Sequence, residues 1–250
     1  SHLVNNGFYE VINDPFISVS KDFSVIVDNP LDSQRKYLRT NLKNSLIKNL
    51  LYNENRQKDC VKLFEISDVY TVKFNSKKRI LGIIASGRVD NNYIDFSKKI
   101  NNQYIENTLS GFLKNIKLDF ETISRESLNS KTKNHISYLE IELSSDFYSE
   151  LNSNEHIPKK NINDYKYNLV SDFPSSKRDL SFAIKNYSNL NALQELILNF
   201  HNKLLKNSFI FDFYNDTNNK EIKIGFRFVF QRDDKTITEN EVNLVMEEII

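Results

Sequence analysis

The sequence has few of the residues that form metal sites, disulfides and membrane spans. It contains one cysteine, Cys60, which excludes an internal disulfide and any zinc site built from several cysteines. Its four histidines lie far apart without metal-ligand spacing, so we expect no metal site. No apolar run approaches the roughly 20 residues that span a bilayer, and we expect no signal peptide. We therefore expect a cytoplasmic protein with no membrane partner.

An excess of charge of one sign is also lacking. Lys and Arg total 34 and Asp and Glu total 33 in 250 residues. Because these charges nearly cancel, the whole chain has no strong field to attract nucleic acid or a membrane. The length fits one large domain or two small ones, and 39% hydrophobic residues are enough to build their cores.

Helix and strand patterns are present in the first part of the chain. Apolar residues at helical spacing predict a helix over 38–52, with Leu42, Leu46 and Leu50 on one stripe. The other elements predicted here are strands over 61–72, 79–87, 118–124 and 138–144, and a helix around 110–116. The polar stretch 152–168 contains Pro158, which disfavours a helix. We therefore expect two domains, 1–165 and 166–250.

In the second part of the chain, the pattern of apolar residues predicts a strand over 178–184, a helix over 189–205, and strands over 208–214 and 221–231. A last helix follows, capped by Thr238. This β-α-β-β-α order is a ferredoxin-like unit without its final strand. In such a sheet the final strand pairs beside the first, so we expect the 178–184 edge to be open.

Alternation along these strands predicts which side chains lie on the sheet face away from the helices. Asp212 and Tyr214 point one way, and Phe211 and Phe213 point the other way. The open face then collects Asp212, Tyr214, Lys223, Arg227 and Ser181.

A tyrosine among cations and hydrogen-bonding groups on an open sheet can stack on an unpaired RNA base, with a carboxylate accepting from the base and cations holding phosphates. An ordinary solvated sheet face has the same composition, and the pattern alone favours that interpretation. Residues 166–250 hold 11 Lys and Arg against 12 Asp and Glu, a net charge of −1, so no basic field supports RNA binding.

Several segments, taken together and in order, resemble the β subunit of phenylalanyl-tRNA synthetases. The first group is GFYEVINDPFIS (7–18), NPLDSQRKYLRTNLKNSLIKNLLYNENR (29–56) and LFEISDVY (63–70). The second group is FPSSKRDLSFAI (173–184), FIFDFYND (209–216) and KTITENEV (235–242). Ser67 stands where the family usually has glycine. The resemblance covers nearly the whole chain and implies a C-terminal fragment of that subunit.

The resemblance implies an α+β fold with two domains. Residues 1–165 would form a class II synthetase-like antiparallel sheet with helices, without catalytic residues, and 166–250 would form a truncated ferredoxin-fold anticodon-binding domain. The fragment would hold no cofactor, whereas the complete enzyme would use ATP and Mg²⁺. Its partners would be the α subunit, in an α2β2 heterotetramer, and tRNA(Phe).

The resemblance also implies roles for individual residues. Asp212 and Tyr214 fall on anticodon-reading positions, with the tyrosine stacking on the first anticodon base. Arg178 lies at a matching basic position, although a structural pairing with a carboxylate explains it equally well. Lys223 departs from the small polar residue expected there, so a phosphate contact is its predicted role.

The helix over 38–52 has two interpretations. It would serve subunit association, or it would be a core helix of its own domain. The interface candidates on it are Arg39, Leu42, Leu46 and Leu50.

The predicted function is therefore a non-catalytic part of phenylalanine–tRNA ligase that supports the α subunit and binds the anticodon stem-loop. The alternative is a scaffold whose ferredoxin-like domain binds protein rather than RNA. An independent small enzyme ranks third, because no nucleophile–base or metal constellation is present. A single-chain organellar synthetase is disfavoured, because the first domain resembles the β subunit rather than a catalytic one.

Overall fold

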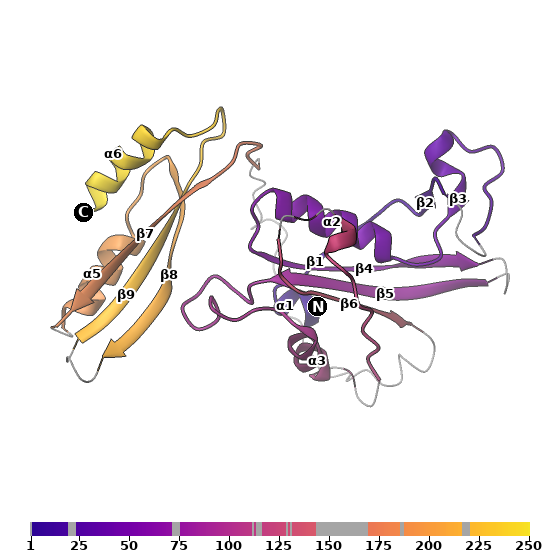
Figure 1. Ribbon diagram of the computed structural model, residues 1–250, viewed down its shortest axis with the longest axis horizontal. Coiled ribbons are helices and arrows are strands. Elements are labelled where there is room, and N and C mark those ends of the chain that lie inside the picture. Colours follow the sequence, from indigo (N-terminus) through magenta and orange to yellow (C-terminus); the bar gives the residue numbers. More distant parts are fainter. Residues whose placement is uncertain are drawn as a thin grey trace, which may run out of the picture. The chain divides into compact units, whose positions relative to one another are not determined.

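The computed structural model describes residues 2–19, 24–71, 76–111, 113, 117–128, 130, 132–143, 170–185, 188–216 and 221–250 (Figure 1). The chain forms two compact units. The first contains Ser1–Gly87 and Lys99–Lys159, and the second contains Arg88–Lys98 and Lys160–Ile250. The predicted domain boundary near residue 165 lies outside the described residues. The sequence did not indicate that 88–98 belongs to the second unit.

The first unit is built on a four-stranded sheet of order β1-β4-β5-β6. Its strands are β1 (Tyr9–Glu10), β4 (Cys60–Thr71), β5 (Ser76–Gly87) and β6 (Ile136–Glu142). β1 runs parallel to β4, and the other pairs are antiparallel. The smaller elements are α1 (His2–Asn5), the paired β2 (Phe16–Ile17) and β3 (Tyr37–Leu38), and 3-10 turns at Ser33–Arg35 and Glu126–Leu128.

Two helices, α2 (Lys43–Asn55) and α3 (Asn102–Ser110), lie on opposite sides of this sheet (Figure 1). The predicted helix over 38–52 is confirmed as α2, with a later start. The helix expected around 110–116 was misplaced, because α3 begins after Asn101, whose side chain accepts a hydrogen bond from the Tyr104 amide. Most of 110–116 lies outside the described residues.

The strand predicted over 118–124 is wrong. This segment makes an isolated bridge between Phe120 and Leu139, and the Glu121 amide donates to the Tyr138 carbonyl at 3.0 Å. A strand needs a continuing ladder, and among the described residues the bridge stops there. The segment 118–124 therefore contacts β6 at one point but does not form a strand, although its apolar residues alternate.

The close contact between α2 and the sheet depends on Gly82, at the middle of β5. A Cβ atom on Gly82 would lie 2.9 Å from Leu46 Cδ1 and 3.0 Å from Leu42 Cδ1, inside van der Waals contact. Both leucines are fully buried. A glycine inside a strand commonly marks such an approach. α2 therefore packs where the sheet has no side chain.

Two carboxylates flank this contact, because Gly82 pairs with Glu65 on β4 and with Glu140 on β6. Glu140 accepts a hydrogen bond from the Leu42 amide at 2.6 Å, at the start of α2. Backbone amides at a helix start have no partner within the helix, so a carboxylate there is stabilising. The sheet thus holds the first turn of α2 by apolar packing and by this bond.

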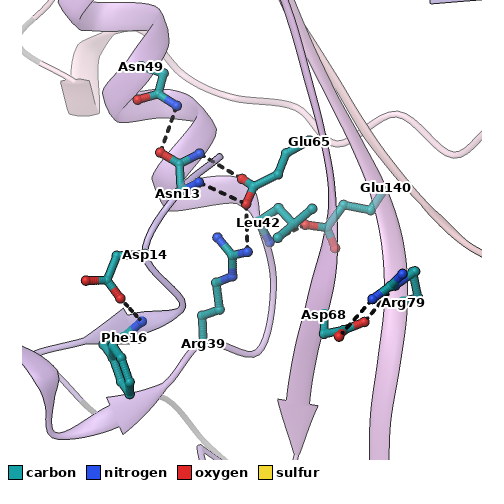
Figure 2. A network of polar contacts seen from close by, with 10 residues as sticks. All are labelled: Asn13, Asp14, Phe16, Arg39, Leu42, Asn49, Glu65, Asp68, Arg79 and Glu140. Atoms are coloured by element: carbon teal, nitrogen blue, oxygen red, sulfur yellow. Dashed lines mark hydrogen bonds and ion pairs between the residues drawn. The ribbon is translucent and has the colours of Figure 1, made fainter. Parts of the chain in front are cut away.

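The second carboxylate, Glu65, anchors the segment that leads into α2 (Figure 2). Arg39 Nη2 donates to Glu65 at 2.7 Å, and both side chains are 2% exposed. Asn13 adds a bond from its side-chain amide at 2.7 Å, and Asn49 on α2 donates to Asn13 at 2.9 Å. Within the described part of the chain, Arg39 Nε and Nη1 are buried without a hydrogen-bond partner.

The far end of α2 is held by Arg125. Its guanidinium makes a bidentate pair with Glu54 at 2.7 and 2.8 Å. It also donates to Ser86 on β5 at 2.7 Å and to the Asn134 carbonyl at 2.8 Å. Planar bidentate pairs of this kind fix geometry as well as supplying energy.

The second unit has a three-stranded antiparallel sheet of order β7-β9-β8. Its elements are β7 (Ser176–Ile184), α5 (Asn189–Leu198), β8 (Leu205–Asp216), β9 (Glu221–Phe230) and α6 (Glu239–Ile249). This is the predicted β-α-β-β-α order. The two helices and one face of the sheet enclose a core that includes Phe226, Phe228 and Phe230, each fully buried.

The helix predicted over 189–205 is shorter than expected, because α5 ends at Leu198. On this helix Leu196 is 66% exposed, whereas the adjacent Ile197 is 1% exposed. Phe200 and Leu204 still pack against the core, from the connection to β8. The predicted range was too long because these apolar residues continue the helical spacing although they lie in the connection after the helix.

The start of α6 confirms the predicted cap. The Thr238 side chain accepts from the Glu241 amide, and the Glu241 carboxylate accepts from the Thr238 amide at 2.9 Å. This reciprocal arrangement is a capping box. The backbone and hydroxyl hydrogen bonds from Thr238, aided by Arg232, lower the pKa of Glu241 to about 2.

Neither a membrane span nor a metal cluster occurs in the described ranges. None of the helices there is long and apolar enough to cross a membrane. No three His, Cys, Asp or Glu side chains among those residues gather closely enough to hold a metal ion.

Replacing Gly82 with alanine should destabilise the first unit by roughly 1–3 kcal/mol, because the added methyl must displace two fully buried leucine side chains. Chemical denaturation would measure the free energy of unfolding. Gly111→Ala is the matched control, because its Cβ would meet the edge of the His2 ring at 3.1 Å and the Thr108 carbonyl at 3.9 Å, an ordinary contact distance. An equal loss in both variants would contradict close packing at Gly82.

Replacing Arg39 with methionine should cost about 3–5 kcal/mol of unfolding free energy, because a buried carboxylate at Glu65 loses its charge partner. The double variant Arg39→Met/Glu65→Gln should recover part of this loss, since it leaves no buried charge while glutamine can still accept from Asn13. A loss below about 1 kcal/mol for the single variant would show that the pair is not the anchor of this segment.

The Glu241 carboxylate should make the stability of the second unit pH-dependent. Its pKa is lowered from 4.5 to about 2, so its contribution is present above pH 4.5 and is lost as the pH falls toward 2. Glu241→Gln should therefore lower the thermal midpoint at neutral pH, with the difference from wild type shrinking between pH 4.5 and 2. Glu247→Gln removes the same charge from the exposed side of α6, and an identical profile for it would contradict the assignment.

Candidate nucleic-acid interface

The sheet of the second unit has one face toward its helices and one face away from them. On β9 the residues buried with the helices are Ile222, Ile224, Phe226, Phe228 and Phe230. The intervening residues Lys223, Gly225, Arg227 and Val229 therefore lie on the other face, which we call the open face. Cross-strand pairing adds Asp179, Ser181 and Ala183 from β7 and Phe209, Asp212 and Tyr214 from β8.

Asp212 and Tyr214 lie together on the open face, as the alternation predicted. Asp212 is opposite Gly225, and Tyr214 is opposite Lys223. Both side chains are exposed, and Tyr214 is 57% exposed. In the described residues, the Asp212 carboxylate makes no hydrogen bond or ion pair. An accepting group and an aromatic ring are thus both accessible at this end of the sheet.

Gly225 lies beside these two residues and is buried against the Phe211 ring. Ser181 and Asp212 flank it on the neighbouring strands, and both are exposed. Lys223 lies one position along the face, with Nζ at 3.4 Å from Glu221 and half of its side chain exposed. The exposed group therefore contains one ring, one carboxylate, one hydroxyl and one cation.

Phe211 does not point away from Asp212, contrary to the expectation from alternation. The register of β8 against β9 shifts between Ile210 and Asp212, which makes Phe211 the extra residue of a β-bulge. Its ring lies against Gly225, where an added Cβ would come within 2.9 Å of Phe211 Cε1. Phe213 is opposite Ile224, on the helix side as predicted.

The other end of the open face is covered. Arg227 donates two hydrogen bonds to Asp179, at 2.7 and 2.6 Å. The ring of Phe96, from the 88–98 segment, lies 5.9 Å from the ring of Phe209 and 5.5 Å from that of Phe211, between centroids. The Arg227 guanidinium is 4.9 Å from the Phe96 centroid. Arg227, predicted as an RNA contact, is thus engaged by protein groups.

Arg178 is not part of the open face. It pairs with Phe228 across the sheet, so its side chain lies on the helix side. Its guanidinium is 3.6 Å from Glu239 in the first turn of α6, and it donates to Ser176 at 3.1 Å. This geometry fits the pairing with a carboxylate that the sequence left as an alternative. An RNA contact by Arg178 stays a prediction.

The interface candidates lie in the segment leading into α2 and on α2 itself, and all are buried. Arg39 is 2% exposed, and Leu42, Leu46 and Leu50 are fully buried. These side chains form the core of their own unit, which fits the second interpretation of this helix. A direct role for them in subunit association stays a prediction.

The structure therefore brings together Asp212, Tyr214, Lys223 and Ser181, and separates Arg178 from them. Sequence reasoning missed the coverage of Gly225 by Phe211 and the coverage of the face by Phe96. Gly225 gave a usable signal, because it is the only residue without a side chain among those that face away from the core on β9. Phe96 gave none, since it lies far away in sequence.

Two protein families match the chain. The ferredoxin-fold anticodon binding domain matches residues 171–250. The phenylalanyl tRNA synthetase beta chain CLM domain matches residues 1–138, more than half of the chain. The first match coincides with the sheet and helices of the second unit, and the second includes the sheet of the first unit through Tyr138.

Curated relatives point to the same family, and the three described here are named phenylalanine–tRNA ligase β subunit. The protein of Buchnera aphidicola subsp. Acyrthosiphon pisum is 24% identical over 99% of this chain and 35% of its own length. That of Mycoplasma mycoides subsp. mycoides is 32% identical over 89% of this chain and 31% of its own. The chloroplastic protein of Pyropia yezoensis is 25% identical over 97% of this chain and 38% of its own length.

The β-α-β-β-α order of the second unit is consistent with the ferredoxin-fold anticodon binding domain that matches its residues 171–250. The chain belongs to the phenylalanyl-tRNA synthetase β chain family. It spans about a third of the length of the curated relatives it matches.

Proposed function

We propose that the chain is a non-catalytic part of phenylalanine–tRNA ligase that binds the anticodon stem-loop of tRNA(Phe) and supports the α subunit. The observation that carries this proposal is the exposed pair of Asp212 and Tyr214 on the open face of a domain in the anticodon-binding family.

The chemistry of the open face suits an unpaired base. The exposed ring of Tyr214 can stack on a base, an interaction worth about 1–3 kcal/mol. The Asp212 carboxylate can accept from the N–H groups of that base. Lys223 lies across from Tyr214, where it can approach a phosphate. Such contacts with a splayed loop base are how single-stranded RNA is read.

In this proposal the first unit has a scaffold role and a class II synthetase-like fold. Its polar core holds α2 through Glu65 and Glu140, which are engaged in structural contacts. The exposed side of α2 carries Asn44, Lys48, Tyr52 and Asn55, spaced as one stripe. If α2 contacts the α subunit, this stripe is available for it, and the buried candidates would act by positioning the helix.

The complete enzyme would be an α2β2 heterotetramer in the cytoplasm. ATP and Mg²⁺ would act at the α subunit, and this chain would contribute no group to that chemistry. The alternative, a scaffold whose ferredoxin-like domain binds protein, is not favoured by the family match to an anticodon-binding domain.

The proposal predicts that Tyr214→Ala weakens binding of a tRNA(Phe) anticodon hairpin by roughly 5- to 150-fold, the equivalent of one lost base stack. Fluorescence anisotropy would measure the affinity at two salt concentrations, beside a hairpin whose first anticodon base is changed. Wild type should prefer the matched hairpin, and Tyr214→Ala should not.

Tyr52→Ala is the matched control, because Tyr52 is 56% exposed, close to the 57% of Tyr214, and lies in the first unit. It should bind the hairpin as wild type does. Equal affinity of wild type and Tyr214→Ala, or no preference between hairpins, would overturn the anticodon-reading role.

A further inference from the structure

We infer that Phe96 restricts the RNA-facing aromatic surface of the sheet to Tyr214, and so makes the face selective for a single stacked base. This inference rests on the proposed function and adds a specificity residue from outside the domain that the anticodon-binding family matches, which begins at residue 171.

The β8 strand presents three aromatic rings toward the open face. Phe209 pairs with Arg227, Phe211 is the bulged residue that covers Gly225, and Tyr214 pairs with Lys223. A row of rings on an open sheet is a stacking platform for several successive bases, and stacking tolerates any base because every base has a π face. An uncovered row would therefore favour unspecific single-stranded RNA.

Phe96 removes two of these rings from the accessible surface. It is 7% exposed and contacts both Phe209 and Phe211, in the second case edge-on. Both of these rings are half-buried, whereas Tyr214 remains exposed. Arg227, which could otherwise stack on a base, lies 4.9 Å from the Phe96 centroid and 5.0 Å from that of Phe211.

The segment that carries Phe96 is ordered by its own hydrogen bonds. The Asn92 side chain accepts from the amides of Ile94 and Asp95, each at 3.0 Å. The Asn92 carbonyl accepts from the Phe96 amide at 2.8 Å. Arg88 donates to the Phe96 carbonyl, and its guanidinium lies 3.9 Å from the Phe96 centroid. A ring held this way needs little further ordering to cover the sheet.

A second contact secures the segment at the same strand. The Tyr93 ring lies 5.5 Å from the Phe213 ring, between centroids. Phe213 lies on the helix side of β8, whereas Phe209 and Phe211 lie on the open face. The segment therefore contacts side chains from both faces of the strand whose end carries Asp212 and Tyr214.

The test compares wild type with Phe96→Ala in the full chain, using two probes: a ten-nucleotide oligouridine and the anticodon hairpin. We expect Phe96→Ala to bind oligouridine about tenfold more tightly, because two rings become available for stacking. The ratio of hairpin affinity to oligouridine affinity should fall. In the Phe96→Ala background, the further substitutions Phe209→Ala and Phe211→Ala should abolish the gain in oligouridine affinity. Tyr214→Ala in the same background should leave most of that gain.

Phe96→Leu is the second variant, since an aliphatic side chain keeps partial cover and should give a smaller gain of the same sign. It keeps the test decisive if Phe96→Ala does not fold, as judged by circular dichroism. A folded Phe96 variant with unchanged oligouridine affinity would overturn the inference. Because oligouridine binding needs no anticodon recognition, a wild type that fails to prefer the matched hairpin would overturn the proposed function alone.

Discussion

In the main sheet of each unit, a glycine on the central strand determines what can pack closely against that strand. The chain has only five glycines, and two of them lie inside the central strands β5 and β9. At Gly82 the vacant space admits the leucines at the start of α2, and at Gly225 it admits the ring of Phe211. The same local feature lets a helix pack closely on the sheet in the first unit and lets a ring of β8 pack closely on β9 in the second.

The polar groups near these two glycines differ in whether other protein groups already bind them. In the first unit the carboxylates beside Gly82 are committed to Arg39 and to the start of α2, so they are structural. In the second unit both Asp179 and Asp212 are exposed, but Asp179 pairs with Arg227, whereas Asp212 makes no ion pair within the described residues. Because an unpaired carboxylate is tolerable only where water can reach it, the exposed end of the face is where recognition chemistry can reside.

Strong periodicity made much of the second unit predictable from the sequence. The alternation on β9 identified the buried phenylalanines, and Thr238 with Glu241 located the start of α6. The pairing of Asp212 and Tyr214 on one face also followed from alternation. Period-two reasoning failed at Phe211, because a bulge inserts one residue without any signature in the side chains themselves.

Other features could not be predicted, because they depend on residues distant in sequence. Alternation along β7 places Arg178 on the same face as Leu180, but its ion pair with Glu239 joins two distant segments. The contact of Phe96 with β8 joins segments more than a hundred residues apart. The burial of the interface candidates in their own unit likewise depends on distant strands. Local pattern does not identify these partners.

The bulge at Phe211 separates two ladders of β8 that are registered independently. Asn207–Ile210 and Asp212–Asp216 each keep a continuous pairing with β9, Phe211 belongs to neither, and a further register shift lies between Leu205 and Asn207. Loss of Phe211 would leave a strand that is regular from Asn207 onward, in which Asp212 still faces Gly225 and Tyr214 still faces Lys223. The strand can therefore accommodate a change of one residue in length at this position without moving the side chains at its exposed end, although the ring over the glycine would be lost.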